Sequence, residues 1–360
     1  AGEAKALAEE KGVDALERDV DVVTTATFSP MCSSGLMLNT GHVRPGLKMQ
    51  KARLDGVPLY GGVACVDLYL GATEEDPDRP GYGGAHVIHK LLSGERLPFE
   101  AEGRPSDCYP TRSIRATLGL EDLNQAYLFN PRNLYQNYDA AWNSSDKPLY
   151  TYMGRLQPGG ATINYASAGE WSPLLNDPRL RCFGLGTRLL VGGGEGYVVW
   201  EGTQYNQAQD RDPDTDLPVG PGATLALMGE LRGMSPDWVR PVSIPGYGVS
   251  LYLGIAAAIP VLDRDMARAL SIRNRDIRVR VNDYAGGGKV GEVSFAELEK
   301  GRTVFRDRDV TTRTMSDNRG ARKLATLLRE RIQDGDFLLT QPVLHLPVLG
   351  RNRPFSGTVH

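Results

Sequence analysis

The chain contains Thr24-Thr25-Ala26-Thr27-Phe28-Ser29-Pro30-Met31-Cys32-Ser33-Ser34-Gly35, directly after the apolar run 20–23. The β-branched content and short length of that run predict a buried strand. Pro30 has no N–H group to donate to a neighbouring strand, so we expect the strand to break at Ser29-Pro30. A thiol, two hydroxyls and a glycine follow the break and predict a tight loop. The rest of the chain is interpreted around this strand and loop.

The loop gives Cys32 two opposite interpretations. Successive backbone N–H groups in a loop of small residues form a concavity that favours an anion. Such a concavity lowers the pKa of a thiol and favours the thiolate, which is the reactive form. The structural alternative is that Cys32 is a small buried hydrophobe, as most free cysteines are. The local sequence alone favours this alternative.

Composition excludes several classes of protein. The 360 residues suffice for one large domain or two ordinary ones, and 24% charged residues with 41% hydrophobic residues are typical of globular proteins. A net charge of −3 disfavours nucleic acid as a partner. No apolar stretch approaches the ~20 residues of a membrane span, so we expect no membrane association. Four cysteines lack metal-ligand spacing and predict neither a metal site nor a disulfide scaffold, which favours the cytoplasm.

Periodicity predicts both helices and strands. Residues 3–18 favour helix, divided at Gly12, and residues 319–332 favour a basic amphipathic helix. Between them lie many short β-branched and aromatic runs separated by glycine and proline, which are typical of strands and turns. We therefore predict an α+β fold over residues 1–360, a single large domain with a mixed β-sheet core and flanking helices.

Two further segments are candidates for binding. Residues 79–92 form a glycine-rich loop that opens into a helix, so that Gly83 and Gly84 precede free helical N–H groups. His86 follows them and is a candidate for proton transfer, or else for a helix cap. Arg132 and Asn133 belong to a polar cluster after a short strand, and an Arg fork suits a carboxylate. For both segments, a purely structural turn or a solvated surface loop is the alternative interpretation.

Several blocks of the chain, taken together and in order, resemble one family, the sulfur-incorporating homocysteine biosynthesis enzymes, also called L-aspartate semialdehyde sulfurtransferases. These blocks are residues 29–35, 81–88, Asp107-Cys108-Tyr109-Pro110, Asn130-Pro131-Arg132-Asn133, 169–178, 200–204 and 246–262.

The resemblance implies an enzyme of anaerobes that places sulfur on the aldehyde carbon of aspartate semialdehyde and yields homocysteine after a two-electron reduction. It implies functional roles for Cys32 and Cys108, whereas Cys65 and Cys182 match no functional position and take the structural interpretation. Many relatives carry CBS domains or a ferredoxin-like domain. We expect neither on this chain, which lacks iron–sulfur cysteine spacing.

These implications give a mechanistic hypothesis. Cys32 carries sulfur as a persulfide that attacks the aldehyde, and Cys108 then resolves the S–S bond, which requires the two thiols to come within disulfide distance. We expect no bound cofactor, but an external two-electron reductant, a ferredoxin-like protein acting in trans. A homo-oligomer is compatible with these features. The residues predicted to bind substrate are Ser33, Ser34, Gly83, Gly84, Arg132 and Asn133, with His86 as the proton-transfer group.

Two other functions remain compatible with the residues. One is a different thiol enzyme, which transfers persulfide sulfur to another aldehyde or acyl substrate. The other is a non-catalytic protein whose glycine-rich loops hold a small anion. Rapid alkylation at moderate pH would separate a catalytic thiol pair from buried structural thiols.

Overall fold

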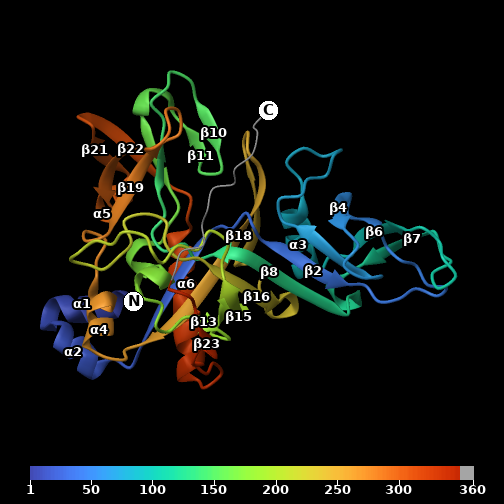
Figure 1. The fold of residues 1–360 in the computed structure, drawn as a ribbon, viewed down its shortest axis with the longest axis horizontal. Helices are drawn as coiled ribbons and strands as arrows, with labels where there is room; N and C mark the ends of the chain where they lie inside the picture. Colours follow the sequence, from blue (N-terminus) through green and yellow to red (C-terminus); the bar gives the residue numbers. More distant parts are fainter. Residues whose placement is uncertain (349–360) are drawn as a thin grey trace.

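A large antiparallel sheet runs through the whole molecule in the computed structural model, which describes residues 1–348 (Figure 1). Its thirteen strands pair antiparallel throughout, with β17 attached to β18 beside the main path. In sheet order these strands are β1 (Val22–Pro30), β18 (Gly248–Pro260), β14 (Arg188–Val191), β15 (Gly194–Glu201), β16 (Leu225–Glu230), β8 (Gln125–Asn133), β2 (Gly35–Asn39), β5 (Asp67–Gly71), β4 (Val57–Tyr60), β3 (Lys51–Leu54), β6 (Leu97–Glu102) and β7 (Ser113–Leu118), with β17 (Val239–Ile244).

A second sheet of six strands contains the parallel pairs β9–β19 and β12–β22, so it is mixed. Its order is β20 (Lys289–Ser294), β19 (Arg278–Asp283), β9 (Ala140–Trp142), β12 (Thr162–Tyr165), β22 (Arg308–Thr314) and β21 (Arg302–Phe305). Two small ribbons complete the strands: β10 (Leu149–Thr151) with β11 (Gly154–Leu156), and β13 (Gly184–Leu185) with β23 (Leu344–His345).

Six α-helices flank the sheets within the described residues. They are α1 (Gly2–Lys11), α2 (Val13–Asp19), α3 (Gly84–Leu92), α4 (Arg264–Ser271), α5 (Phe295–Glu299) and α6 (Asn318–Gln333), accompanied by the short 3-10 turns 120–122, 158–160, 169–171, 173–175 and 231–233. The predicted α+β class with flanking helices is confirmed. One detail differs, because the main sheet is purely antiparallel and only the smaller sheet is mixed.

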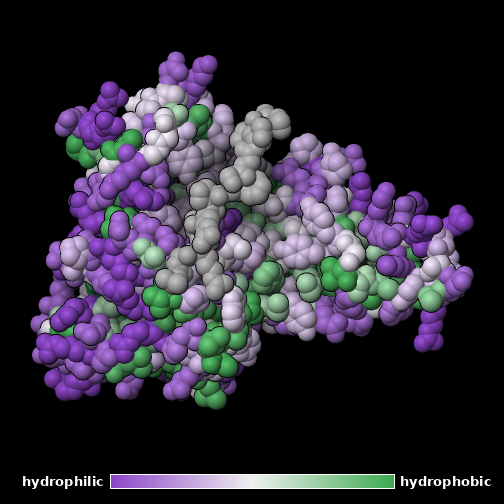
Figure 2. Space-filling view, in the orientation of Figure 1, coloured by the Kyte–Doolittle hydropathy of each residue, from purple (hydrophilic) through white to green (hydrophobic). Residues whose placement is uncertain are grey.

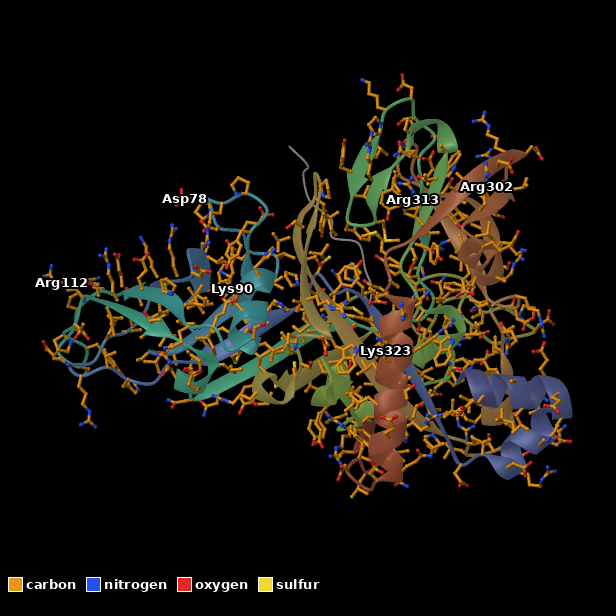
Figure 3. All side chains as sticks on the ribbon, turned by 180° about the vertical axis from the view of Figure 1, so that it is seen from behind. Asp78, Lys90, Arg112, Arg302, Arg313 and Lys323 are labelled. Atoms are coloured by element: carbon orange, nitrogen blue, oxygen red, sulfur yellow. The ribbon has the colours of Figure 1, made fainter. Side chains whose placement is uncertain are left out.

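Residues 35–122 form a projection from this body, which we call the arm. It carries β2 to β7 and α3 and extends to one side of the molecule in Figure 1. In Figure 3, Arg112 lies at the far tip of the arm, whereas Lys323 marks α6 on the body. Helix α3 packs its buried apolar face, with Val87, Ile88 and Leu91 at helical spacing, against β17 and β18 as well as against β2 and β5 of the arm.

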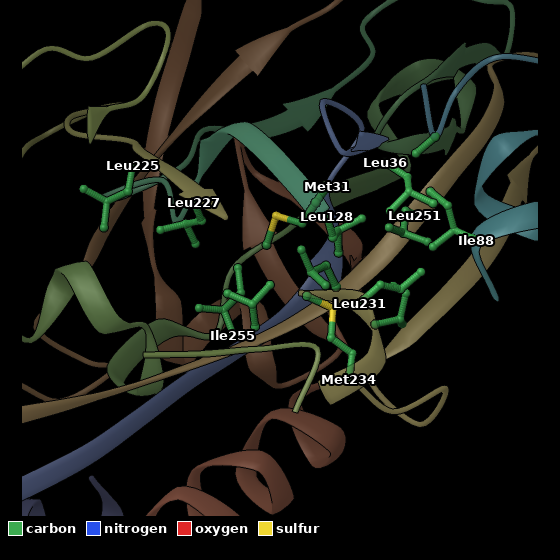
Figure 4. Close-up of a cluster of buried hydrophobic side chains, with 14 of the residues drawn as sticks. Met31, Leu36, Ile88, Leu128, Leu225, Leu227, Leu231, Met234, Leu251 and Ile255 are labelled. Atoms are coloured by element: carbon green, nitrogen blue, oxygen red, sulfur yellow. The ribbon is translucent and has the colours of Figure 1, made fainter. Parts of the chain in front are cut away.

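The interior of the sheet joins the arm to the body. Leu36, Leu128, Leu227 and Leu251 are almost fully buried and belong to one continuous apolar cluster, drawn in Figure 4. Met31 belongs to the same cluster. The residue directly before Cys32 is therefore anchored in the core.

Helix α6 packs on one face of the main sheet, over β1 and β18. Its buried residues Ala321, Leu324, Ala325 and Leu328 follow the i, i+3, i+4, i+7 pattern, and the side chain of Asp317 caps its first turn by accepting the N–H of Gly320 at 2.7 Å. The pattern predicted this helix over 319–332, and the structure gives 318–333.

The surface in Figure 2 is mostly hydrophilic, with apolar residues gathered over β13 and β23. Leu338, Val343 and Leu344, in and before β23, are more than half exposed. Within residues 1–348, no helix is both long enough and apolar enough to cross a bilayer.

Candidate active site

Strand β1 ends where the sequence predicts, and its end positions Cys32. Pro30 is the last residue paired with β18, opposite Tyr252. The N–H of Met31 then donates to the carbonyl of Leu251 at 2.7 Å, and the chain turns back through a hydrogen bond from Ser34 N–H to Met31 O at 3.0 Å. The predicted tight loop around Cys32 is therefore confirmed, and it delivers the chain directly into β2.

Cys32 is half-buried and lines a cavity of about 260 Å³. The walls come from segments that are distant in sequence. They are the end of β1 with the Cys32 loop, the end of β8 with the residues after it, the β10–β11 turn, residues 166–172, Gln204, the β17–β18 hairpin and Met315. The lining residues used below are Cys32, Ser33, Arg132, Tyr135, Tyr138, Tyr152, Gln204 and Tyr247. This volume suits a ligand smaller than most drug-sized molecules.

Two hydroxyl groups surround the sulfur of Cys32. Ser250 is fully buried, and its Oγ donates to Cys32 Sγ at 3.0 Å. The hydroxyl of Tyr247 also hydrogen-bonds Cys32; burial and this sulfur raise the pKa of the phenol to about 12. Cys32 is therefore not simply a small buried hydrophobe, because two hydroxyl donors face its sulfur.

Arg132 faces the same cavity and is half-buried. Asn130 fixes the backbone beneath it, because Asn130 Oδ1 accepts the N–H of Arg132 at 2.8 Å while Asn130 Nδ2 donates to Ser34 Oγ at 2.7 Å. Within residues 1–348, no carboxylate lies within ion-pair distance of the Arg132 guanidinium. An anionic ligand could therefore take the guanidinium without displacing an existing carboxylate.

The predicted substrate-binding residues divide into two groups. Ser33 and Arg132 line the cavity. Ser34 and Asn133 do not line it: Ser34 is buried against Asn130, and Asn133 is fully buried with its Oδ1 accepting the N–H of Leu134 at 2.8 Å. These two side chains pack behind the cavity wall and do not face the cavity.

Gly83, Gly84 and His86 also lie outside the set that lines the cavity. A side chain on Gly83 would collide with the carbonyl of Glu74, and one on Gly84 with the carbonyl of Gly71. These glycines therefore let α3 approach β5 closely, which is the structural alternative. His86 also has a structural role, because its Nδ1 accepts the N–H of Gly83 at 3.2 Å and caps α3. Its ring stacks on Tyr82, and burial lowers the pKa of His86, followed by nearby Lys90.

The glycine-rich loop contributes to the site indirectly. The carboxylate of Glu75 accepts the N–H of Val249 at 3.0 Å and the N–H of Gly81 at 3.3 Å. Ser243 Oγ donates to Gly81 O at 2.6 Å. These bonds fasten the arm to the β17–β18 hairpin that carries Tyr247 and Ser250.

The structure does not bring Cys108 to Cys32. Cys108 is exposed in the turn before β7, its carbonyl lies against Gly46, and the ring of its neighbour Tyr109 stacks on His42 with centroids 6.3 Å apart. His42 follows the end of β2 and Cys32 precedes its start. Strand β2 alone spans about 14 Å at ~3.4 Å per residue, whereas disulfide Cα atoms lie at most about 6.8 Å apart. The expected bridging distance is not met in this conformation.

The other two cysteines are also separated from Cys32. Tyr109 hydrogen-bonds Cys65, which raises the pKa of that phenol and places Cys65 beside the Cys108 turn. Cys182 is buried, and burial followed by the Asp177 carboxylate raises the pKa of its thiol to about 12. Such a thiol stays protonated and unreactive, which supports the structural interpretation of Cys182.

Sequence reasoning missed a cluster of tyrosines around the cavity. The hydroxyl of Tyr138 donates to Tyr152 at 2.9 Å, Tyr152 and Tyr284 share a hydrogen bond of 2.6 Å, and Tyr135 donates to Gln204 Oε1 at 2.7 Å. Burial raises the pKa of Tyr138 and of Tyr284, and raises the pKa of Tyr135 to about 12. Tyr135 follows shortly after the polar cluster of Arg132 and Asn133, whereas the other tyrosines come from separate elements with no shared motif.

Comparisons with known proteins agree with the resemblance in the sequence. The family described as "Homocysteine biosynthesis enzyme, sulfur-incorporation" matches residues 1–339. A protein of Methanosarcina acetivorans named L-aspartate semialdehyde sulfurtransferase is 42% identical over 357 residues, 98% of this chain and 69% of that protein. A protein of the same name from Methanocaldococcus jannaschii is 40% identical over 375 residues, 98% of this chain and 70% of that protein.

A third relative, an uncharacterised protein of Methanothermobacter thermautotrophicus, is 26% identical over 296 residues, 79% of this chain and 64% of that protein. No solved structure gives a significant match. The family match extends over every element that builds the Cys32 cavity, from β1 to Met315. This chain belongs to the family of sulfur-incorporating homocysteine biosynthesis enzymes.

Proposed function

We propose that this protein transfers sulfur to L-aspartate semialdehyde and so forms L-homocysteine. The names of the two relatives at 40% and 42% identity support this substrate. The observation that carries the proposal is the cavity that places the Cys32 thiol and the Arg132 guanidinium around one space. A small amino acid aldehyde offers a carboxylate for the guanidinium and an electrophilic carbon for sulfur.

In the proposed mechanism, the Cys32 thiolate takes the outer sulfur of a persulfide donor, whose own thiolate leaves, and Cys32 carries that sulfur as a persulfide. The terminal sulfur attacks the aldehyde carbon, and the substrate is then joined to Cys32 through an S–S bond. The Cys108 thiolate attacks the Cys32 sulfur, which releases the thiolated substrate and leaves a Cys32–Cys108 disulfide. The released adduct carries a hydroxyl and a thiolate on one carbon, and it loses that oxygen as water to give a thioaldehyde. An external ferredoxin-type reductant supplies two electrons that reduce the thioaldehyde to the thiol and two more that regenerate the dithiol.

The position of Cys108 adds a requirement to this mechanism. Because Cys108 lies at the other end of β2 from Cys32, its thiol must be delivered to the cavity before it can resolve the S–S bond. Delivery by the chain's own arm and delivery by the arm of a second copy are the two routes. Mixing two inactive variants separates these routes, as described in the Discussion.

The direct test supplies the purified protein with aspartate semialdehyde, a persulfide as sulfur donor and a low-potential reductant, and measures homocysteine by mass spectrometry. We expect homocysteine from the wild type and from Cys65→Ser, which removes a thiol of the arm that the mechanism does not use. We expect none from Cys32→Ser. Absence of homocysteine from the wild type would contradict the proposed function.

A further inference from the structure

The hairpin between β17 and β18 presents two hydroxyl groups to the sulfur of Cys32. Ser250, inside β18, donates to Cys32 Sγ at 3.0 Å from a fully buried position. Tyr247, in the hairpin turn, hydrogen-bonds the same sulfur from the mouth of the cavity, where it is 44% exposed. Two donors stabilise a sulfur anion more than a neutral thiol and also fix its direction. The hairpin therefore fixes the orientation of this sulfur in the cavity.

The phenols around the cavity differ in where their protons are held. Tyr135 donates its proton to Gln204, and Tyr138 donates its proton to Tyr152. Tyr152 in turn shares a hydrogen bond with Tyr284. The partner of the Tyr247 hydroxyl is the Cys32 sulfur itself. Its proton therefore lies beside the Cys32 sulfur, the atom that carries the reacting terminal sulfur, whereas the other phenol protons are held by groups in the cavity wall.

The carbonyl oxygen needs such a proton. When sulfur adds to an aldehyde, negative charge develops on the oxygen, and a donor placed there lowers the barrier. The pKa of Tyr247, raised to about 12 by burial and the sulfur, means that the phenol keeps its proton at neutral pH. Tyr247 therefore enters the reaction as a donor and not as a base.

We propose that Tyr247 is a catalytic proton donor and that Ser250 is a positioning residue for the Cys32 sulfur. This inference rests on the proposed function. In the addition step, the terminal persulfide sulfur forms a bond to the aldehyde carbon and the C=O π pair moves to oxygen. The proton of Tyr247 passes to that oxygen, giving a hydroxyl and a phenolate, and solvent returns a proton to the phenolate. No electrons enter or leave in this step.

The test compares Tyr247→Phe, Ser250→Ala and the control Tyr150→Phe with the wild type. Tyr150 packs against Gly246 of the same hairpin and is about half exposed, so the control removes a neighbouring hydroxyl that does not reach the sulfur. The first measurement is the pH dependence of iodoacetamide alkylation of Cys32, followed by peptide mass spectrometry. The second measurement is the steady-state rate of homocysteine formation, separated into kcat and KM.

We expect Tyr247→Phe and Ser250→Ala to move the alkylation midpoint upward by roughly half to one pH unit, because each loses a hydrogen bond to the thiolate. We expect Tyr247→Phe also to lower kcat about 100-fold with little change in KM, which is typical of a lost general acid. Tyr150→Phe should behave as the wild type in both measurements. A structural role for the phenol would not produce the shifted alkylation profile, because the Phe ring keeps the packing.

Two results would overturn the inference. A Tyr247→Phe enzyme with wild-type kcat would remove the donor role, and an unchanged alkylation profile would remove the contact with the sulfur. The alkylation measurement needs neither substrate nor sulfur donor. A wild type that forms no homocysteine would therefore contradict the proposed function, while the alkylation profile would still decide whether Tyr247 acts on Cys32.

Discussion

Cys32 and Cys108 occupy turns with similar sequence character but opposite surroundings. Both turns adjoin a strand, and both contain a proline and a serine within three residues of the thiol. Cys32 is enclosed by residues from several distant segments and faces two hydroxyl donors, whereas Cys108 is exposed at the arm with His42 and Gly46 as neighbours of its turn. The comparison teaches that a reactive site is built by what the fold brings to a turn. The turn itself is common.

The largest effect should come from removing the enclosed thiol. Cys32→Ser should lower turnover on the order of 10⁴-fold or more, because the nucleophile is lost, and should accumulate no persulfide. Cys108→Ser should still gain the adduct of about 32 Da, one sulfur atom, but should not turn over repeatedly. Intact-mass analysis after exposure to the sulfur donor measures both. An adduct that persists in Cys32→Ser and disappears in Cys108→Ser would reverse the two roles.

Mixing the two inactive variants tests how Cys108 reaches the cavity. If a second copy delivers its arm, Cys32→Ser and Cys108→Ser mixed in equal amounts should recover about a quarter of wild-type activity, since half of the dimers contain one complete pair. If the chain's own arm delivers Cys108, the mixture should stay inactive. Rates of homocysteine formation are compared before and after subunit exchange, with each variant alone as the baseline.

Substitutions of Arg132 test whether the cavity around Cys32, unlike the Cys108 turn, binds the substrate carboxylate. Arg132→Ala should weaken binding of aspartate semialdehyde about 10- to 100-fold, which corresponds to the ~1.5–3 kcal/mol of a hydrogen bond to a charged group. Arg132→Lys should recover part of this loss because it keeps the charge without the fork. Calorimetric titration measures the affinity, and wild-type affinity in Arg132→Ala would argue against a carboxylate clamp.

Relative thiol reactivity gives a smaller and more direct comparison. Although Cys108 is the more exposed thiol, we expect Cys32 to react first with iodoacetamide at neutral pH, because hydroxyl donors stabilise its thiolate. Peptide mapping after brief labelling measures the two rates in one sample. Faster labelling of Cys108 would show that access outweighs thiolate stabilisation.

The smallest effect should come from His86. His86→Ala should lower the free energy of unfolding by about 1 kcal/mol, the usual value of a helix cap, and leave Cys32 alkylation unchanged. Because burial lowers the pKa of His86 in the fold, the histidine's contribution is present above the unfolded value of about 6.5 and is lost as pH falls. Denaturant titrations at pH 5 and pH 8 test this; a loss of turnover without a loss of stability would restore the catalytic role.

Local signals in the sequence predicted the local structure. Pro30 ends β1, Gly12 divides α1 from α2, and the apolar spacing of residues 321–328 fixes the buried face of α6. Each of these depends on residues within one or two turns of chain. The predicted turn at Cys32 follows from the same local rules, whereas its anchoring by Met31 depends on a core that distant strands build.

Pairings across long sequence distances could not be predicted in this way. Strand β2 enters the sheet between β8 and β5, and this placement puts the Cys108 turn at the far end of β2 from Cys32. Tyr247 and Ser250 reach Cys32 from more than 200 positions away, through the register of β1 with β18. Side-chain chemistry in the sequence identified the thiol and the guanidinium. The block 246–262 contains both hydroxyl donors, but their contact with Cys32 depends on the register of β1 with β18.

The contacts of Glu75 have a mechanical consequence. Its carboxylate holds Gly81 of the arm and Val249 of the hairpin at once, and Ser243 adds a second fastening to Gly81. The arm therefore cannot swing without carrying the hairpin with it or breaking these hydrogen bonds. A protein that binds the arm near Cys108 and moves it would also move the hairpin that holds Tyr247 beside Cys32. Occupancy of the distant tip would then be transmitted as a displacement at the reacting sulfur, through the hydrogen bonds of Glu75 and Ser243.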